Sequence, residues 1–448
     1  MSDYSKADHI SRREFLKQGL GIMAGATILY LCDIPLARAF ETVPKPSQLR
    51  ARAKSVIQIW MWGGPSHLDT FDPKPNAGPD YCGPLNQAMP TNVNGIQINA
   101  ALPLLANQAD KYSIIRSMTH GINGHETASY VMQTGRKPGG RLVYPCMGAV
   151  VCLFKGYDYG YKGLIPPYIV LTQPQGRFSE AGFLGQKYKP FATGGDPAQK
   201  RFAVAGIVTE GLTDKHQADR RALLHSLDSL GKAMPDNKDF KKLDACENKA
   251  YSLILGEERN VFDLSLEEDK LRDDYGRNTF GQSCLAARRL VERGVPWVTI
   301  NYRGWDTHKH HFETMRKKLP EMDKGMARLL TDLKDRGLLD STIVLWGGEF
   351  GRGPKVQWEE PWNGGRSHYG KCFTWVVAGG GFKGGCVVGA SDARGEEVKE
   401  RPVYPHDLIG SVYELMGIDP EGSLPNSMGL SVKVMPSEGG GGRLREIM

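Results

Sequence analysis

The sequence predicts an α/β fold built on a doubly wound, mostly parallel sheet with helices on both faces. Short runs rich in β-branched and aromatic residues, typical of buried strands, alternate with longer helix-forming segments. Several of these runs end in glycine-rich turns followed by polar residues, which is the pattern at the ligand-binding edge of open α/β sheets. The chain has 448 residues, of which 40% are hydrophobic, so a single large core is available.

The strand and helix signals follow one another along most of the chain. Strands are predicted at 55–62, 112–118, 167–171, 296–302, 341–346 and 373–378, and helices at 125–134, 312–336 and 406–417. Residues 213–294 are charged and helix-forming, and no Pro/Gly linker isolates them, so we interpret them as a helical insertion. One domain therefore spans 40–432, and the Gly-rich residues 433–448 are predicted to form a flexible tail.

The amino end has the features of an export signal. Residues 11–17 (SRREFLK) match the twin-arginine consensus, and the apolar segment 19–31 that follows is too short to span a bilayer. Ala37-Arg38-Ala39 supplies a small-x-small cleavage pattern. We therefore predict a signal peptide at 1–39, a partnership with the twin-arginine (Tat) translocase, and a folded periplasmic or secreted protein that is not transmembrane after cleavage.

Charge and cysteine usage exclude some partners and sites. The net charge of +7 is mild for this length, and no basic run is interleaved with aromatics, so nucleic acid is not expected as a partner. This charge fits an anionic substrate and an ordinary solvated surface equally well. No cysteine pair has the CxxC spacing, so a thiolate zinc site is not indicated.

The most informative stretch is residues 304–311, GWDTHKHH, which directly follows the predicted strand at 296–302. Asp306 with His308 or His310 offers a carboxylate oxygen and imidazole nitrogens, the ligand types that suit zinc and related divalent metals. The alternative is a solvated polar loop, which the concentration of histidines disfavours.

Other predicted strand ends carry polar groups as well. Because the carboxyl ends of parallel strands meet at one edge of the sheet, we expect these groups to converge on a metal site. They are His67 and Asp69; His120, His125 and Thr127; and Glu349, joined by Arg366 and His368 from a loop just before the strand at 373–378.

The chain resembles an uncharacterised family of exported proteins, domain of unknown function 1501, which is grouped with the sulfatase and alkaline phosphatase superfamily. The matching segments lie in the expected order and cover most of the chain from about 55 to 430: 63–75, 116–136, 304–308, 347–352, 364–370 and 406–418.

The resemblance implies two metals at the sheet edge and a hydroxyl nucleophile at a helix start. Asp306 with His310 is similar to an Asp-x-x-x-His ligand pair, whereas the GWDTH segment points to His308, and His368 resembles the third ligand. Glu349 occupies a position where the superfamily usually has Asp as a ligand of the second metal.

The chain departs from the superfamily pattern at two places. Phe350 stands where a histidine is expected, and Gly63-Gly64 replaces an early acid. Those departures imply that a second site is missing, or that it is rebuilt from side chains further along the chain: Asp69, His67, His120 or His125.

Thr127 is the candidate nucleophile, because it lies at a predicted helix start where free N–H groups favour an anion. The alternative is that Thr127 only caps the helix. Arg366, like Arg116, Arg136 and Arg352, is a candidate clamp for a tetrahedral anion. The Cys motif of formylglycine sulfatases is not present in the sequence.

These features predict a metal-dependent hydrolase of phosphate or sulfate esters, with an anionic small-molecule ester as substrate. The expected cofactor is a divalent metal, zinc first, with manganese, calcium or magnesium as alternatives. The alternative function is non-catalytic: a protein with a degenerate site that binds a ligand or serves in a protein assembly.

The twin-arginine signal is testable by itself. Replacing Arg12 and Arg13 together by Lys removes the paired guanidinium groups of the consensus, so the precursor is expected to stay in the cytoplasm. Cell fractionation with immunodetection measures this, and normal periplasmic levels of the double variant would show the signal interpretation to be wrong.

Overall fold

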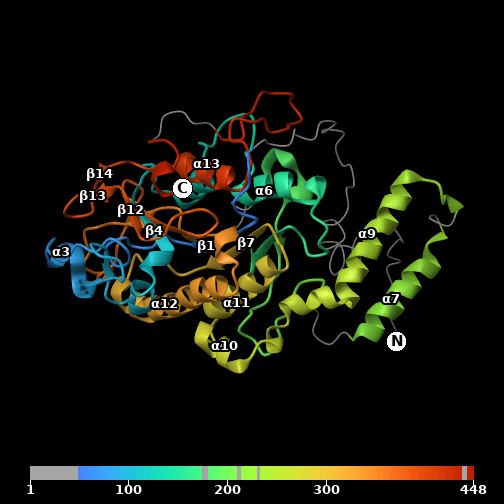
Figure 1. The fold of residues 1–448 in the computed structure, drawn as a ribbon, viewed down its shortest axis with the longest axis horizontal. Coiled ribbons are helices and arrows are strands. Elements are labelled where there is room, and N and C mark those ends of the chain that lie inside the picture. Colours follow the sequence, from blue (N-terminus) through green and yellow to red (C-terminus); the bar gives the residue numbers. More distant parts are fainter. Residues whose placement is uncertain (1–48, 174–179, 209–212, 230–232, 436–440) are drawn as a thin grey trace, which may run out of the picture.

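The centre of the molecule is an eight-stranded sheet in the order β12-β4-β11-β8-β1-β7-β5-β6 (Figure 1). The computed structural model describes residues 49–173, 180–208, 213–229, 233–435 and 441–448. The strands, in chain order, are β1 Ser55–Met61, β4 Tyr112–Met118, β5 Tyr168–Leu171, β6 Phe191–Ala192, β7 Trp297–Tyr302, β8 Thr342–Gly347, β11 Phe373–Ala378 and β12 Cys386–Val388.

The sheet is mostly parallel, as predicted, with one reversed strand. The central strand β1 pairs in parallel with β7 and β8. The exception is β11, which runs antiparallel to both β4 and β8. The beginning of β11 therefore lies at the same sheet edge as the carboxyl ends of its neighbours, and so does the segment that leads into it.

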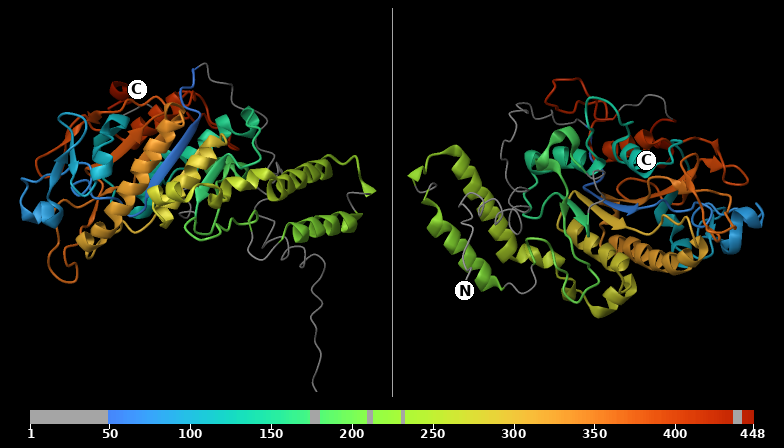
Figure 2. Two further views of the ribbon diagram at one scale, coloured as in Figure 1. Left: turned by 60° about the horizontal axis from the view of Figure 1, so that its bottom comes forward. Right: turned by 180° about the vertical axis from the view of Figure 1, so that it is seen from behind.

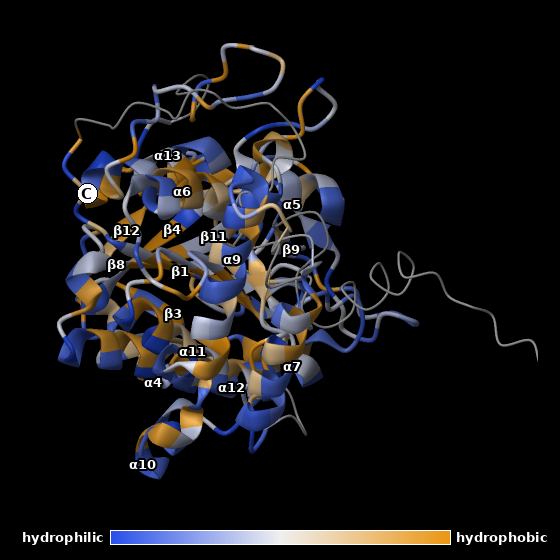
Figure 3. Ribbon diagram, turned by 90° about the vertical axis from the view of Figure 1, so that its right-hand side faces the viewer, coloured by the Kyte–Doolittle hydropathy of each residue, from blue (hydrophilic) through white to orange (hydrophobic). Residues whose placement is uncertain are grey.

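Helices cover both faces of the sheet. One face packs against α4 (Pro103–Ala106), α11 (Thr279–Glu292) and α12 (His311–Asp335), and the other against α5 (His125–Thr134), α6 (Met147–Lys155) and α13 (Pro405–Leu415). In β1, Ile57 and Ile59 belong to the first core and Val56 and Trp60 to the second, as the two-residue period of a strand requires. Figure 3 shows the hydrophobic strands between the two helical layers. The doubly wound prediction is confirmed.

The predicted helical insertion divides into two structurally different parts. Helices α7 (Asp214–Leu227) and α9 (Lys238–Leu255) lie side by side and extend away from the α/β body (Figures 1 and 2). They are followed by α10 (Asp269–Tyr275), which packs on α11 and α12. In contrast, α11 contacts β7 and α12 and forms part of the main core, so it is a crossover helix of the α/β body.

Smaller elements border the sheet edge. They are α3 Pro79–Cys82, β2 Ala88–Pro90, β3 Gln97–Asn99, β9 Gly351–Arg352, β10 His368–Tyr369, β13 Ala390–Ser391 and β14 Val398–Glu400. The strands β9 and β10 pair with each other in antiparallel orientation. This small ribbon holds the segments after β8 and before β11 together.

The end of the chain corrects the predicted flexible tail. Leu444 and Ile447 are buried, the Lys383 N–H donates to the Ile447 carbonyl at 2.7 Å, and Arg401 pairs with Glu446 at 2.8 Å. The glycine content of this segment predicted flexibility, but Leu444 and Ile447 pack into the core and anchor residues 441–448. Residues 436–440 of that segment lie outside the described part.

The predicted export signal at 1–39 also lies outside the described residues. Within the described ranges, no helix is long and apolar enough to cross a membrane.

Candidate metal centre

Four side chains from three chain segments meet at the edge of the sheet where β1, β7 and β8 end. His125 is the first residue of α5, which follows β4. Asp306 and His308 lie on the loop after β7, and His368 begins β10, just ahead of the reversed strand β11. The parallel strands and the reversed strand together bring these distant segments to one place.

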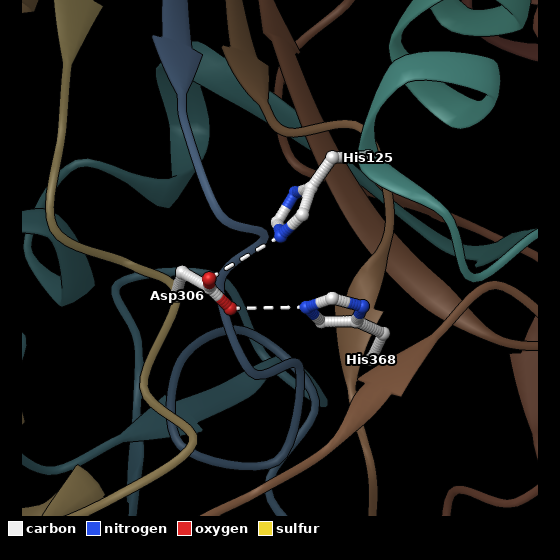
Figure 4. A group of neighbouring side chains, drawn as sticks. All are labelled: His125, Asp306 and His368. Carbon is white, nitrogen blue, oxygen red and sulfur yellow. Dashed lines mark hydrogen bonds and ion pairs between the residues drawn. The ribbon is translucent and has the colours of Figure 1, made fainter.

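The carboxylate of Asp306 is the centre of this cluster, which we call the Asp306 cluster. Its Oδ1 lies 3.0 Å from His368 Nε2 and 3.1 Å from His308 Nε2, and its Oδ2 lies 3.2 Å from His125 Nε2. The two nitrogens of His308 and His368 are themselves 2.8 Å apart. Figure 4 shows both His125 and His368 directed at the Asp306 carboxylate.

Hydrogen bonds on the far side of two of the rings indicate which nitrogen carries the proton when the ring is neutral. His368 Nδ1 lies 2.7 Å from the Asn123 carbonyl, and His125 Nδ1 lies 2.7 Å from Glu349 Oε1. These oxygens only accept hydrogen bonds, so each Nδ1 donates its N–H. In the neutral rings, Nε2 then presents a lone pair to the centre of the cluster, which is the arrangement of a metal-bound histidine.

The surroundings shift the pKa values of the cluster members in different directions. Hydrogen bonds to Asp306 and Glu349 raise the pKa of His125 to about 9. Burial lowers the pKa of His308, and the nearby Arg352 guanidinium adds to this. Burial tends to raise the pKa of Asp306, but hydrogen bonds from His125 and His368 hold it well below its usual range.

The donor set fits a divalent metal. His125, Asp306 and His368 each offer one ligand atom, and these atoms lie within 4.8 Å of one another. Metal bonds to nitrogen and oxygen are about 2.0–2.2 Å long, so ligand atoms this close together could share one ion. His308 Nε2 is placed to serve as a further ligand. Imidazole and carboxylate together suit zinc and related metals.

Glu349 lies behind the cluster and not in it. It is fully buried, and its Oε1 accepts hydrogen bonds from His125 Nδ1 at 2.7 Å and from the Gly63 N–H at 3.0 Å. The sequence assigned Glu349 as a ligand of a second metal, whereas the structure makes it the carboxylate that orients His125. Such outer carboxylates fix the ring and raise its basicity.

Several residues predicted as ligands are held by other partners. His120 uses Nε2 on the Glu349 carbonyl and Nδ1 on the Ile122 N–H, and His67 Nε2 faces the Gly395 carbonyl. The carboxylate of Asp69 pairs with Arg366 and His311. His120 and Asp69 are therefore engaged by these partners, whereas among the described residues His67 Nδ1 is buried without a hydrogen-bond partner. A second metal site built from these residues stays a prediction.

The structure also separates the two candidate histidines of the 304–311 stretch. His310 adopts a left-handed backbone conformation at the start of α12, and its ring lies 3.7 Å from Glu313. The neighbouring ring of His308 turns inward to Asp306 instead. The DTH spacing, and not the Asp-x-x-x-His spacing, describes the cluster.

The arginine that reaches the cluster is Arg352. Its buried guanidinium donates to Asp306 Oδ1 at 2.8 Å and to the Gly63 carbonyl at 3.0 Å. Arg366, the predicted anion clamp, is fully buried and directed at Asp69 and at backbone carbonyls. It has no exposed surface to offer an anion.

Thr127 lies in the first turn of α5, two residues after His125, and is exposed. The residue before the helix is Gly124, and no side chain caps the helix start. The alternative that Thr127 caps the helix is not supported, because Thr127 lies inside the helix and not at its N-cap. Its proposed catalytic role remains a prediction.

Phe350 closes the cluster on the side where a second-metal histidine was expected. Its ring is fully buried and stacks on His368 with 4.5 Å between ring centroids. Trp62 stacks on His125 in a similar way, at 5.3 Å. The aromatic rings restrict the orientation of both imidazoles.

Two glycines allow the loops to come this close. A side chain at Gly63, whose φ is +108°, would overlap the backbone of Asp306, and one at Gly365 would overlap the carbonyl of His308. The glycine-rich turn at Gly63 is visible in the sequence, but the close approach of these loops is not, because no sequence pattern predicts which loops will touch.

Fold and site together define a class: an α/β protein with a histidine–carboxylate cluster at the sheet edge that could hold a metal ion. Within this class, the chain belongs to the family described as protein of unknown function (DUF1501), whose model matches residues 53–447. No curated protein matches the chain.

The chain also has low similarity to several solved structures. They include the lipoteichoic acid synthase LtaP from Listeria monocytogenes (9% identity, 88% of this chain and 78% of that chain, TM-score 0.37). A protein in the alkaline phosphatase superfamily from Vibrio parahaemolyticus (10%, 89% and 76%, 0.36) and the PsFucS1 sulfatase from Pseudoalteromonas sp. (14%, 82% and 68%, 0.36) are also among them.

The raised pKa of His125 predicts how the metal-free protein responds to pH. Because the pKa in the folded state is about 9 and the unperturbed value is about 6.5, protonated His125 stabilises the fold fully below pH 6.5. This contribution is lost as the pH rises through 9 and amounts to at most roughly 3 kcal/mol.

The measurement is the free energy of unfolding of chelator-treated protein between pH 6 and 10, for wild type and His125→Asn. The difference between the two should shrink as the pH rises. A difference that is constant over this range would contradict the proposed hydrogen bonds of His125 to Asp306 and Glu349.

Proposed function

We propose that this protein is a divalent-metal-dependent hydrolase of phosphate or sulfate esters that acts in the periplasm or outside the cell. The observation that carries the proposal is the crowding around Asp306 Oδ1, which has the Nε2 atoms of His308 and His368 within 3.1 Å. A carboxylate oxygen and two imidazole nitrogens at these distances repel one another unless a proton or a cation lies among them, and one divalent metal satisfies all three.

The residues around the cluster have separable tasks in this proposal. His125, Asp306 and His368 hold the metal, with His308 as a further ligand, and Glu349 holds the Nδ1 proton of His125. A bound divalent metal supplies positive charge that lowers the pKa of a coordinated hydroxyl or water. Arg352 limits the negative charge that Asp306 adds to the site.

The start of α5 supplies a place for an anionic ester. Helix N-termini offer free N–H groups and the positive end of the helix dipole, and here no side chain occupies that position as a cap. Thr127 is the hydroxyl in this first turn and is our candidate for the attacking group. An ester held there would lie beside His125 and the rest of the Asp306 cluster.

A second function is favoured by one observation. Phe350 fills the position where the superfamily resemblance implies a histidine of a second metal, and it packs on His368. A centre with one metal and a buried aromatic wall also suits a non-catalytic protein that binds an anionic ligand or a protein partner. Turnover measurements separate the two functions.

The metal assignment is tested with two matched variants. His308→Asn and His310→Asn make the same change two positions apart, and only His308 reaches Asp306. We expect elemental analysis of the purified mature protein to find about one divalent metal per chain in wild type and in His310→Asn, and a clear loss in His308→Asn. Equal metal content in the two variants would show that His308 is not a metal ligand.

The catalytic assignment is tested on aryl phosphates, phosphodiesters and aryl sulfates with zinc, manganese, calcium and magnesium. Thr127→Ala should reduce turnover by orders of magnitude with metal content unchanged, because it removes the attacking oxygen. Thr127→Ser keeps a hydroxyl and should keep most of the activity. If wild type turns over none of these esters with any metal, the non-catalytic function replaces the hydrolase.

A further inference from the structure

A buried carboxylate, Asp69, connects two of the segments that carry the Asp306 cluster. It is fully buried on the loop after β1, and its Oδ2 accepts a hydrogen bond from His311 Nε2 at 2.9 Å and forms an ion pair with Arg366 Nε at 2.8 Å. Its Oδ1 accepts a hydrogen bond from Arg366 Nη2 at 3.3 Å. His311 and Arg366 are also fully buried. The sequence assigned Asp69 as a metal ligand and Arg366 as an anion clamp, and neither side chain faces the cluster.

The first connection runs through His311 to the loop after β7. Because His311 donates its Nε2–H to Asp69, its Nδ1 is the acceptor for the Thr307 hydroxyl at 2.6 Å. Thr307 is buried and stands between the two cluster residues Asp306 and His308. The side chain of Thr307 points into the protein, so its neighbours on either side point to the cluster.

The second connection runs through Arg366 to the segment before β11. Arg366 lies two residues before His368, and its backbone N–H donates to the Thr307 carbonyl at 3.1 Å. Its guanidinium also donates to the Gly353 carbonyl at 3.0 Å and the Tyr81 carbonyl at 2.7 Å. With Asp69 these bonds hold Arg366 in a single place.

We propose that Asp69 is a positioning residue that sets the spacing between Asp306, His308 and His368 by anchoring Thr307, through His311, and Arg366. The proposal rests on the metal centre of the proposed function. Ligand atoms must be held within a few tenths of an ångström for tight metal binding, and residues that orient ligands change affinity without touching the metal. Asp69 is the shared acceptor of both connections.

The same loop contains a matched control, Asp72. It is also fully buried and paired with cations, at 3.0 Å from Lys74 and 3.3 Å from Arg116, and it accepts a hydrogen bond from Ser391. Within the described part of the chain, its hydrogen-bond and ion-pair partners include no residue of the 306–308 loop and none of 366–368. If the removal of any buried carboxylate weakens metal binding, Asp72→Asn should therefore weaken it as much as Asp69→Asn does.

The experiment measures the dissociation constant for Zn²⁺ by chelator competition, and the visible spectrum with Co²⁺ in place of zinc, for the full mature protein. Asp69→Asn should weaken zinc binding about tenfold or more and change the Co²⁺ spectrum. Thr307→Val, which is isosteric and removes only the hydroxyl, should act in the same direction. Asp72→Asn should stay within about twofold of wild type, even where its thermal unfolding temperature falls.

The outcomes distinguish this inference from the proposed function. Wild-type affinity and spectrum in Asp69→Asn, or equal weakening in Asp72→Asn, overturns the positioning role and leaves the metal centre in place. If Asp69→Asn does not fold, Thr307→Val decides by itself, and unchanged binding in that variant overturns the role. Failure of wild type to bind any divalent metal overturns both proposals. If metal binding depends on Asp69 but the protein turns over no ester, only the proposed hydrolase activity is overturned.

Discussion

The site depends on one electrostatic constraint, the crowding of basic atoms around Asp306. Two imidazole nitrogens lie within 3.1 Å of the same carboxylate oxygen, and they lie 2.8 Å from each other. Lone pairs at such distances repel unless a proton or a metal ion lies among them. Several contacts between residues far apart in the chain hold this arrangement in place.

The reversed strand β11 is what completes the cluster. In an all-parallel sheet, a segment that leads into a strand lies at the opposite edge from the segments that leave the other strands. Because β11 runs antiparallel to β4 and β8, His368 reaches the edge occupied by the loop after β7 and the start of α5. The β9–β10 ribbon then holds it against Arg352.

Buried charged side chains lie behind the cluster and hold it in place. Glu349, Arg352, Asp69 and Arg366 are all buried. Removing one partner of such a pair leaves an uncompensated charge, so these groups stabilise only as a set. Phe350 and Trp62 add apolar walls that restrict the imidazole rings.

The sequence by itself determined the α/β class and the six main strands to within a residue or so. It also selected Asp306, His308 and His368, whose side chains the fold brings together. These follow from local patterns, since strand composition and strand-end polar residues are properties of short segments. The sequence did not separate His308 from His310, and it did not predict the partners that Asp69, Arg366 and Glu349 have in the fold. It also missed α6, Thr307, His311 and the anchored carboxyl end. Each of these outcomes depends on contacts between residues far apart in the chain, such as Glu349 with His125, and only the tertiary structure decides which of two nearby side chains turns inward.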